Sequence, residues 1–195
     1  MFETDRTPKR VGIVGLGLIG GSFAKAYADA GIEVFAADID ERAMNAAMAE
    51  ETVAGPLDEA TIPTCELLIL AVYPQAIIEW VRSHEQFISP STLVIDCGSV
   101  KRSVCPVCFS IAERCGFTFI GGHPMAGLQY SGYRHARADL YAGQPMVLVP
   151  PEIYDPDIIL WAEEALSPSS SAYFSSAFCC TSSAFSNFCM SSIVA

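Results

Sequence analysis

The sequence predicts an α/β fold with a doubly wound, mostly parallel sheet. Three observations support this fold class. Short apolar runs alternate with longer helix-like segments through residues 11–149. The runs are apolar throughout, which is typical of parallel strands that helices cover on both faces. The first run is followed by a cluster of glycines and then by a helix-like segment, all within residues 11–30, which is how a βαβ unit with a tight first turn begins.

The expected elements follow this alternation from the N-terminus. Apolar runs predict the strands, and the longer segments between them predict the helices. Residues 41–50 are rich in alanine and methionine, which favour helices, and Pro74 suits the first turn of a helix. The expected strands are 11–14, 34–37, 67–72, 93–95, 117–120 and 146–149. The expected helices are 18–30, 41–50, 74–87, 101–114 and 152–166.

Length and charge limit the classes of protein. A chain of 195 residues is long enough for one domain with its own core and part of a second. The net charge of −11 argues against nucleic acid as a partner, because phosphate contacts need a basic face. The sequence contains no uninterrupted run of about 18 apolar residues, so it predicts no membrane-spanning helix. Lys9 and Arg10 precede an apolar run as in a signal peptide, but glycines interrupt that run, so we expect a cytoplasmic protein.

The eight cysteines are expected to be free thiols in a protein of this kind. Cys105 and Cys108 have the C-x-x-C spacing of zinc and redox sites, but no second pair at a suitable spacing follows them. We therefore predict no metal site, and we interpret these two cysteines as chance neighbours near the start of a helix.

The chain changes character after the last expected helix. Pro150 and Pro151 close a first domain of residues 1–151, and residues 152–166 form one further helix. Residues 167–195 contain no charged residue, are rich in Ser, Phe, Cys and Ala, and follow neither a helical nor a strand period. This composition is typical of out-of-frame translation joined to a normal protein, and we expect no native structure there.

The glycine cluster has the spacing of a dinucleotide-binding (Rossmann) loop, and it lies between an expected strand and an expected helix. Gly15 permits the tight turn, Gly17 lets the backbone approach a pyrophosphate, and Gly20 lets helix and strand pack closely. Leu18 and Ile19 begin the helix, whose N-terminal N–H groups attract phosphate. The alternative is that the glycines serve only a strand-to-helix turn.

An acid supports the nucleotide interpretation. Asp38 ends the next strand, roughly 20 residues further on, where a carboxylate accepts hydrogen bonds from a ribose 2′-OH. Its charge would repel a 2′-phosphate, which favours NAD over NADP. Arg42 lies close by in the sequence and leaves NADP open. The order strand, loop, helix, strand and acid predicts a nucleotide site.

Two further motifs follow expected strands, DCGSVK at residues 96–101 and GGHPMAG at residues 121–127. Ligands of open α/β sheets bind outside the carboxyl ends of the strands, so both motifs are expected beside the nicotinamide. His123 is the candidate acceptor of a proton from a hydroxyl whose carbon loses hydride; its alternative role is to cap a strand end. Ser99 is expected to orient His123, to contact the cofactor or to cap the next helix. Lys101 is expected to be a solvated residue in the first turn of that helix.

The stretches GIVGLGLIGGSFAKA, DCGSVK and GGHPMAGLQYSG together resemble the prephenate and arogenate dehydrogenases of tyrosine biosynthesis, over roughly residues 10–166. The resemblance implies NAD-dependent oxidative decarboxylation of prephenate to 4-hydroxyphenylpyruvate or of arogenate to tyrosine. Hydride passes to the nicotinamide, CO2 leaves and the ring becomes aromatic. The resemblance also implies that His123 is the catalytic histidine, that Ser99 is its partner, and that no metal is required.

The same resemblance assigns further residues and partners. It implies a substrate-binding role for Gln129, at a place where some members carry an acid. It also implies a second, helical domain that forms a homodimer and contributes substrate-binding groups. Residues 152–166 would begin this domain, and the rest of it is largely missing. The loop that it implies beside the cofactor consists of Val72, Tyr73 and Pro74.

Two other interpretations stay open at this point. One is a Rossmann domain that binds NAD but turns nothing over. The other is a 3-hydroxyacid or imine reductase with the same N-terminal fold, which the sequence His-Pro-Met-Ala-Gly disfavours.

Overall fold

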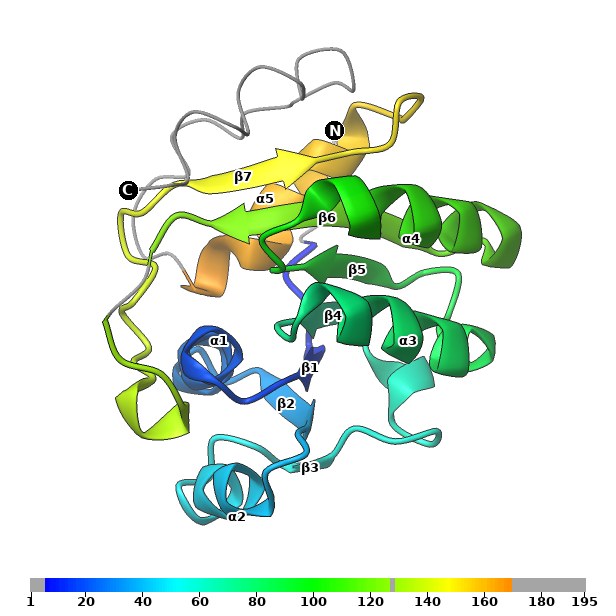
Figure 1. Ribbon diagram of the computed structural model, residues 1–195. Helices are drawn as coiled ribbons and strands as arrows, with labels where there is room; N and C mark the ends of the chain where they lie inside the picture. Colours follow the sequence, from blue (N-terminus) through cyan, green and yellow to red (C-terminus); the bar gives the residue numbers. More distant parts are fainter. Residues whose placement is uncertain (1–5, 127–128, 170–195) are drawn as a thin grey trace.

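The computed structural model describes residues 6–126 and 129–169. In this part of the chain seven strands form one sheet, in the order β3-β2-β1-β4-β5-β6-β7 (Figure 1). Neighbouring strands are parallel from β3 to β6, and β7 is antiparallel to β6. The predicted doubly wound, mostly parallel sheet is confirmed. The strands are β1 (Arg10–Val14), β2 (Glu33–Ala37), β3 (Gly55–Pro56), β4 (Leu67–Leu70), β5 (Leu93–Asp96), β6 (Thr118–Pro124) and β7 (Met146–Val149).

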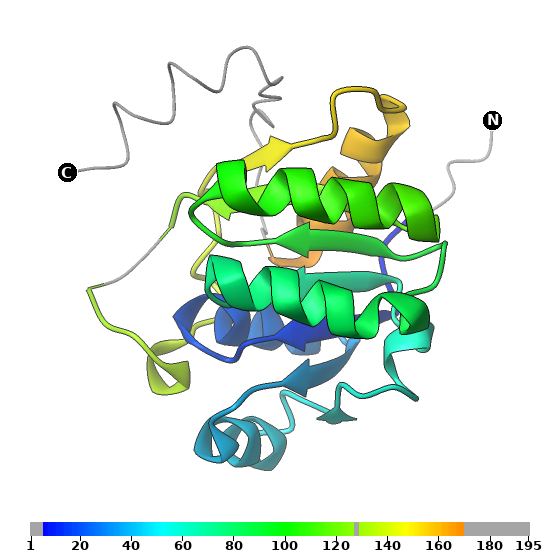
Figure 2. The same ribbon diagram turned by 45° about the vertical axis from the view of Figure 1, so that its right-hand side comes forward.

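Helices cover both faces of the sheet. Figure 1 shows α3 and α4 in front of it and α5 behind it, and Figure 2 shows α3 and α4 lying side by side. Helices α1, α2 and α5 share one hydrophobic cluster, and α3 and α4 share the other. The helices are α1 (Leu18–Asp29), α2 (Glu41–Ala49), α3 (Pro74–His84), α4 (Lys101–Cys115) and α5 (Asp157–Leu166), with short 3₁₀ turns η1 (Ile62–Thr64), η2 (Glu85–Phe87), η3 (Tyr133–His135) and η4 (Ser167–Ser169).

The central strand β4 shows why its sequence is apolar throughout. Leu67 and Ile69 pack into the cluster that contains α1 and α5, and Leu68 and Leu70 pack into the cluster that contains α3 and α4. All four side chains are fully buried. Burial of such a side chain contributes about 1.5–3 kcal/mol, so a strand between two helical layers gains from apolar residues at every position.

Two strands differ from the prediction at their carboxyl ends by more than one residue. The strand expected at 67–72 ends at Leu70, so Val72 lies in the turn that leads to α3. The strand expected at 117–120 continues to Pro124, because the antiparallel strand β7 pairs with its last four residues. The extension places His123 inside a strand rather than after one.

Helix α5 is shorter than expected. It begins at Asp157 rather than at residue 152, with Pro156 at its N-cap, and a residue before proline is disfavoured in a helix. The C-terminal part of α5 packs into the same core as α1, and the Tyr27 hydroxyl donates to the carbonyl of Ala165 at 2.8 Å. The short strand β3 was not expected, since two residues carry no periodic pattern.

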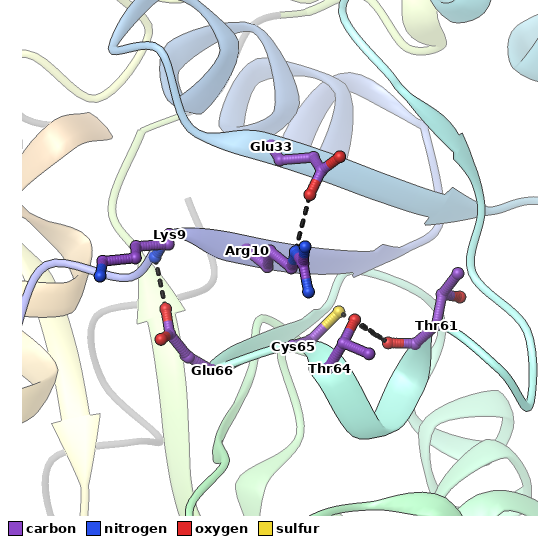
Figure 3. Close-up of polar contacts among 7 residues, drawn as sticks. All are labelled: Lys9, Arg10, Glu33, Thr61, Thr64, Cys65 and Glu66. Atoms are coloured by element: carbon purple, nitrogen blue, oxygen red, sulfur yellow. Dashed lines mark hydrogen bonds and ion pairs between the residues drawn. The ribbon is translucent and has the colours of Figure 1, made fainter.

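The amino ends of the central strands are joined by polar contacts (Figure 3). Arg10 Nε donates to Glu33 Oε2 at 2.7 Å and connects β1 with β2. The backbone N–H of Lys9 donates to the carboxylate of Glu66, just before β4. These contacts join the amino ends of the strands at the edge opposite the predicted site. They contribute little to the free energy of unfolding, because exposed ion pairs are weak.

The interpretation of residues 167–195 as out-of-frame sequence concerns mostly residues 170–195, which lie outside the described residues. Within the described ranges, no helix has both the length and the apolar character that crossing a membrane demands.

Candidate nucleotide-binding and active site

The glycine loop connects β1 with α1 at the carboxyl edge of the sheet. Gly15 has a φ of +91°, which L side chains rarely adopt, and its N–H donates to the carbonyl of Ala37 at 2.8 Å. A Cβ on Gly20 would lie 1.9 Å from the carbonyl oxygen of Gly15. The loop and the first turn of α1 therefore touch at this point, and only glycine permits that approach.

Gly17 has a different environment. A Cβ at this position would meet nothing within 4 Å, and φ is −71°, which suits any residue. Gly17 is the N-cap of α1 and supplies no side-chain hydrogen bond to the helix. The N–H groups of Leu18 and Ile19 thus begin a helix whose N-terminus carries partial positive charge. The open space and the uncapped helix end suit the pyrophosphate of a dinucleotide.

Asp38 follows β2 and faces the glycine loop. Its Oδ2 accepts a hydrogen bond from the N–H of Leu16 at 2.5 Å, and its Oδ1 accepts one from the N–H of Asp40 at 2.7 Å. The carboxylate thus holds the loop in place, a role that the sequence did not reveal. Each carboxylate oxygen has a further lone pair, so these contacts leave capacity for a ribose hydroxyl.

The segment after β4 lies between the glycine loop and the turn after β5. A Cβ added at Gly15 would lie 2.6 Å from Val72 Cγ1, and a Cβ added at Gly98 would lie 3.9 Å from Pro74 Cγ. Tyr73 is the N-cap of α3 and its side chain is 86% exposed. Val72 and Pro74 therefore contact the predicted site, whereas the Tyr73 side chain reaches into solvent.

The turn after β5 contains a buried ion pair. Asp96 is fully buried, Lys101 is 4% exposed, and Lys101 Nζ donates to Asp96 Oδ2. The expectation that Lys101 is solvated is therefore wrong. A lysine in the first turn of a helix opposes the helix dipole, and this unfavourable position was the sequence signal for a carboxylate partner. Ser99 lies between the two charged residues, in the turn that enters α4.

His123 lies on β6 opposite Val147 of β7. Its Nδ1 is buried and, within the described residues, has no hydrogen-bond partner. Burial, and next the positive charge of Lys101, lower the pKa of His123 below its ordinary 6.5. A pKa below the ordinary value favours the neutral imidazole at pH 7, which is the form that a proton acceptor requires.

The segment between β6 and β7 packs against α1. Ser22 Oγ accepts from the N–H of Arg137 at 3.0 Å and donates to the carbonyl of Leu18 at 2.7 Å. The Tyr141 hydroxyl donates to the carbonyl of Ile19 at 3.0 Å. Gln129 is exposed near the beginning of this segment. The segment that follows β6 thus contacts the first turn of the predicted nucleotide-binding helix.

The C-x-x-C pair lies inside α4. Cys105 and Cys108 are buried and free, and burial raises the pKa of both thiols to about 12. In residues 6–126 and 129–169, no group of three or more His, Cys, Asp or Glu side chains is placed to hold a metal.

The structure brings the predicted residues together at one edge. The sheet order changes direction between β1 and β4. The residues that follow strands on both sides of that point are the glycine loop, Asp38, Val72 and Ser99, and His123 lies near the carboxyl end of β6. Ligands of doubly wound sheets bind in the crevice outside the strand ends at such a point. The geometry therefore suits a dinucleotide beside a histidine that accepts a proton.

Comparisons with known proteins agree with this geometry. A family model described as the nucleotide-binding domain of prephenate dehydrogenase matches residues 23–171. The matched range contains Asp38, Ser99 and His123 and begins just after the glycine loop.

Individual relatives point the same way. The probable prephenate dehydrogenase NovF of Streptomyces niveus is 32% identical over 139 residues, which cover 71% of this chain and 37% of the relative. The structure of Synechocystis arogenate dehydrogenase has a TM-score of 0.77 at 27% identity and covers 88% of this chain and 59% of that one. The prephenate dehydrogenase of Aquifex aeolicus, solved with hydroxyphenyl propionate and NAD+, has a TM-score of 0.71 at 25% identity, covering 83% and 57%. The chain thus spans less than two thirds of each.

Proposed function

Because the chain belongs to the family of prephenate dehydrogenase nucleotide-binding domains, we propose that it binds NAD and serves the oxidative decarboxylation of prephenate or arogenate. The observation that carries the proposal is that an open glycine loop and a neutral, half-buried His123 lie at one edge of the sheet. The Aquifex relative binds NAD+ together with an aromatic acid, which supports this pairing of ligands.

The residues present suit the cofactor. The open side of Gly17 and the N–H groups of Leu18 and Ile19 would receive the pyrophosphate. The carboxylate of Asp38 would accept hydrogen bonds from the adenosine ribose. Its negative charge disfavours a 2′-phosphate, and this supports NAD rather than NADP. Val72 and Pro74 would border the nicotinamide half.

His123 carries the proton transfer in this proposal. NAD, when bound, supplies the acceptor for the hydride that leaves the ring carbon bearing the hydroxyl. The neutral imidazole of His123 accepts the hydroxyl proton as the carbonyl forms. When the carboxylate leaves as CO2, the electron pair of the broken C–C bond makes the ring aromatic and turns the carbonyl oxygen into a phenolate, which takes the proton back from His123. Aromatisation contributes much of the driving force, so His123 has only to hold and receive one proton. Ser99 would orient His123 or the substrate hydroxyl, and exposed Gln129 would contact the substrate.

Turnover is tested by following NADH absorbance with prephenate and arogenate in turn. We expect His123→Asn to abolish turnover and to leave the Kd for NAD within about a factor of three, because asparagine keeps a polar side chain without a basic nitrogen and the position lies away from the proposed phosphate site. Persistent turnover would show that His123 is not the proton acceptor. NAD binding by the unmodified chain with neither substrate converted would favour a nucleotide-binding domain without catalysis.

The cofactor preference needs a variant that keeps the glycine loop. Asp38→Asn retains one acceptor oxygen and the shape of the side chain, whereas alanine would also release the N–H of Leu16. We expect the asparagine variant to gain NADP affinity relative to NAD. Asp29→Asn, an exposed residue at the other end of α1, makes the same change in net charge and should not alter the ratio. An unchanged ratio in Asp38→Asn would contradict the ribose contact.

A further inference from the structure

One buried carboxylate, that of Asp96, connects the segment that carries Ser99 with the segment that carries His123. Asp96 Oδ2 accepts a hydrogen bond from the N–H of Gly98 at 3.0 Å, and its Oδ1 accepts one from the N–H of Gly122 at 3.3 Å. Gly98 directly precedes Ser99, and Gly122 directly precedes His123. The two oxygens of a carboxylate have a fixed separation, so these bonds relate the backbone beside Ser99 to the backbone beside His123.

Lys101 makes this arrangement possible. An unpaired charge at full burial costs several kcal/mol, and a counter-ion together with hydrogen bonds offsets part of that cost. Burial still raises the pKa of Asp96 above its ordinary value, against the opposing effect of Lys101 and the two backbone N–H groups. Lys101 Nζ bonds to the same oxygen that accepts from Gly98. The carboxylate thus has three donors from three elements, the turn after β5, the first turn of α4 and the strand β6.

The glycines of both motifs leave the space that this carboxylate and the lysine stem occupy. A Cβ on Gly121 would lie 2.6 Å from Cys105 Sγ and 3.3 Å from Lys101 Cδ. A Cβ on Gly98 would lie 3.2 Å from Asp96 Oδ2, and one on Gly122 would lie 2.6 Å from the backbone oxygen of Asp96. Gly98 and Gly121 therefore leave room for the carboxylate and the lysine stem, whereas Gly122 lets β6 approach the backbone of β5.

We propose that Asp96 is a positioning residue, which through Gly98 and Gly122 fixes Ser99 and His123 relative to each other, with Lys101 as its buried counter-ion. The inference rests on the proposed function, since it assumes that Ser99 and His123 act together. Neither Asp96 nor Lys101 contacts the reacting atoms in this proposal. The competing account is that the pair stabilises the fold and has no specific effect on the two catalytic segments.

The test uses a variant in which no unpaired charge remains. Asp96→Asn combined with Lys101→Met removes both charges, and the single amide oxygen of asparagine cannot serve both N–H groups in the same way. Thr92→Val is the matched control: Thr92 is also fully buried, its hydroxyl donates to the carbonyl of Cys65 at 2.8 Å, and it lies at the opposite end of β5. Both variants lose buried polar contacts, but only one loses them beside the site.

The readouts are amide hydrogen exchange and the NMR signals of the imidazoles. The chain has three histidines, so His123→Asn identifies the signals of His123. In the double variant we expect exchange at Gly98 or Gly122 to rise at least tenfold relative to Gly12 in β1, and the His123 signals to shift. Thr92→Val should change neither. Exchange rates at both Gly98 and Gly122 equal to those of the unmodified chain would overturn the proposal, even if the His123 signals shift, because loss of the Lys101 charge shifts those signals by itself.

A measurement on the unmodified chain covers the case in which the double variant does not fold. Scalar couplings across hydrogen bonds from the amides of Gly98 and Gly122 to the carboxyl carbon of Asp96 should be detected, and their absence would refute the connection. None of these readouts needs substrate, so a chain without turnover disproves the proposed function and leaves this test decisive. In a chain that does turn over, the double variant should lose at least tenfold in kcat with the KM for NAD within twofold.

Discussion

Two glycines of the same loop should respond in opposite ways to one added methyl group. Gly17→Ala places a Cβ in open space at a φ of −71°, which alanine adopts without strain. Loss of unfolded-state entropy stabilises such a variant by about 0.4–1 kcal/mol. The weaker N-capping of alanine costs a similar amount. We therefore expect the free energy of unfolding to stay within about 1 kcal/mol of the unmodified value.

The affinity for NAD should fall in the same variant. The added methyl group of Gly17→Ala occupies the side of the loop that would face the pyrophosphate, and crowding of this kind costs about 1–3 kcal/mol. Since each 1.4 kcal/mol corresponds to a tenfold change in Kd, we expect binding to weaken by about 5- to 150-fold. The added methyl group thus separates nucleotide binding from stability.

Gly20→Ala should behave in the opposite manner. Its Cβ would lie 1.9 Å from the Gly15 carbonyl oxygen and 3.1 Å from Ala71 Cβ, so α1 would have to move by roughly 1 Å against a packed core. We expect a loss of about 1–3 kcal/mol or more in the free energy of unfolding. Denaturant unfolding and calorimetric titration with NAD measure both quantities. If Gly17→Ala unfolds as easily as Gly20→Ala, or binds NAD like the unmodified chain, the assignment of the phosphate site to Gly17 is wrong.

Three other outcomes follow from the site. NMR titration should give His123 a pKa below 6.5. Lys101→Met should raise that pKa, because the positive charge of the lysine is the second cause of the lowering after burial. An unchanged pKa in the variant would show that the charge of Lys101 does not act on His123. Since the folded-state pKa lies below that of the unfolded chain, the unfolded state binds more protons between the two values. Stability measured in urea should therefore fall as the pH drops below about 6.5, and His123→Gln should reduce that slope. Tyr141→Phe loses the hydrogen bond to the Ile19 carbonyl and should cost about 0.5–1.5 kcal/mol, measured against Tyr130→Phe at an exposed site.

The sequence predicted those parts of the fold that depend on local pattern and on turn chemistry. The order of the strands and helices was readable because each central strand is buried on both faces and is apolar throughout, as β4 shows. The helix predicted over 152–166 begins too early. Pro156 disfavours helical backbone in the residue before it, and α5 begins at Asp157. Strand β3 has two residues and depends on its pairing with β2, which no local pattern records.

The sequence predicted which motifs form the candidate site, but it did not predict the contacts between their side chains. The sequence indicated that Ser99 and His123 would approach the same edge, because the carboxyl ends of neighbouring parallel strands meet there. It did not indicate that Lys101 is buried, since burial depends on the space left by Gly121, on a different strand. The hydrogen bond between Asp38 and the N–H of Leu16 likewise joins residues 22 positions apart and needed the folded loop to be seen.

The contacts of α1 connect the segment after β6 with the proposed nucleotide site. The carbonyls of Leu18 and Ile19 accept hydrogen bonds from Ser22 and Tyr141, and the N–H groups of the same two residues begin the helix that would receive the pyrophosphate. Ser22 in turn accepts from the N–H of Arg137, in the segment that leaves β6 after His123. Hydrogen bonds from the segment after β6 thus hold the first turn of α1 in place. Any change that displaces the segment between β6 and β7 should therefore weaken NAD binding, even though that segment lies more than a hundred residues from the glycine loop in the sequence.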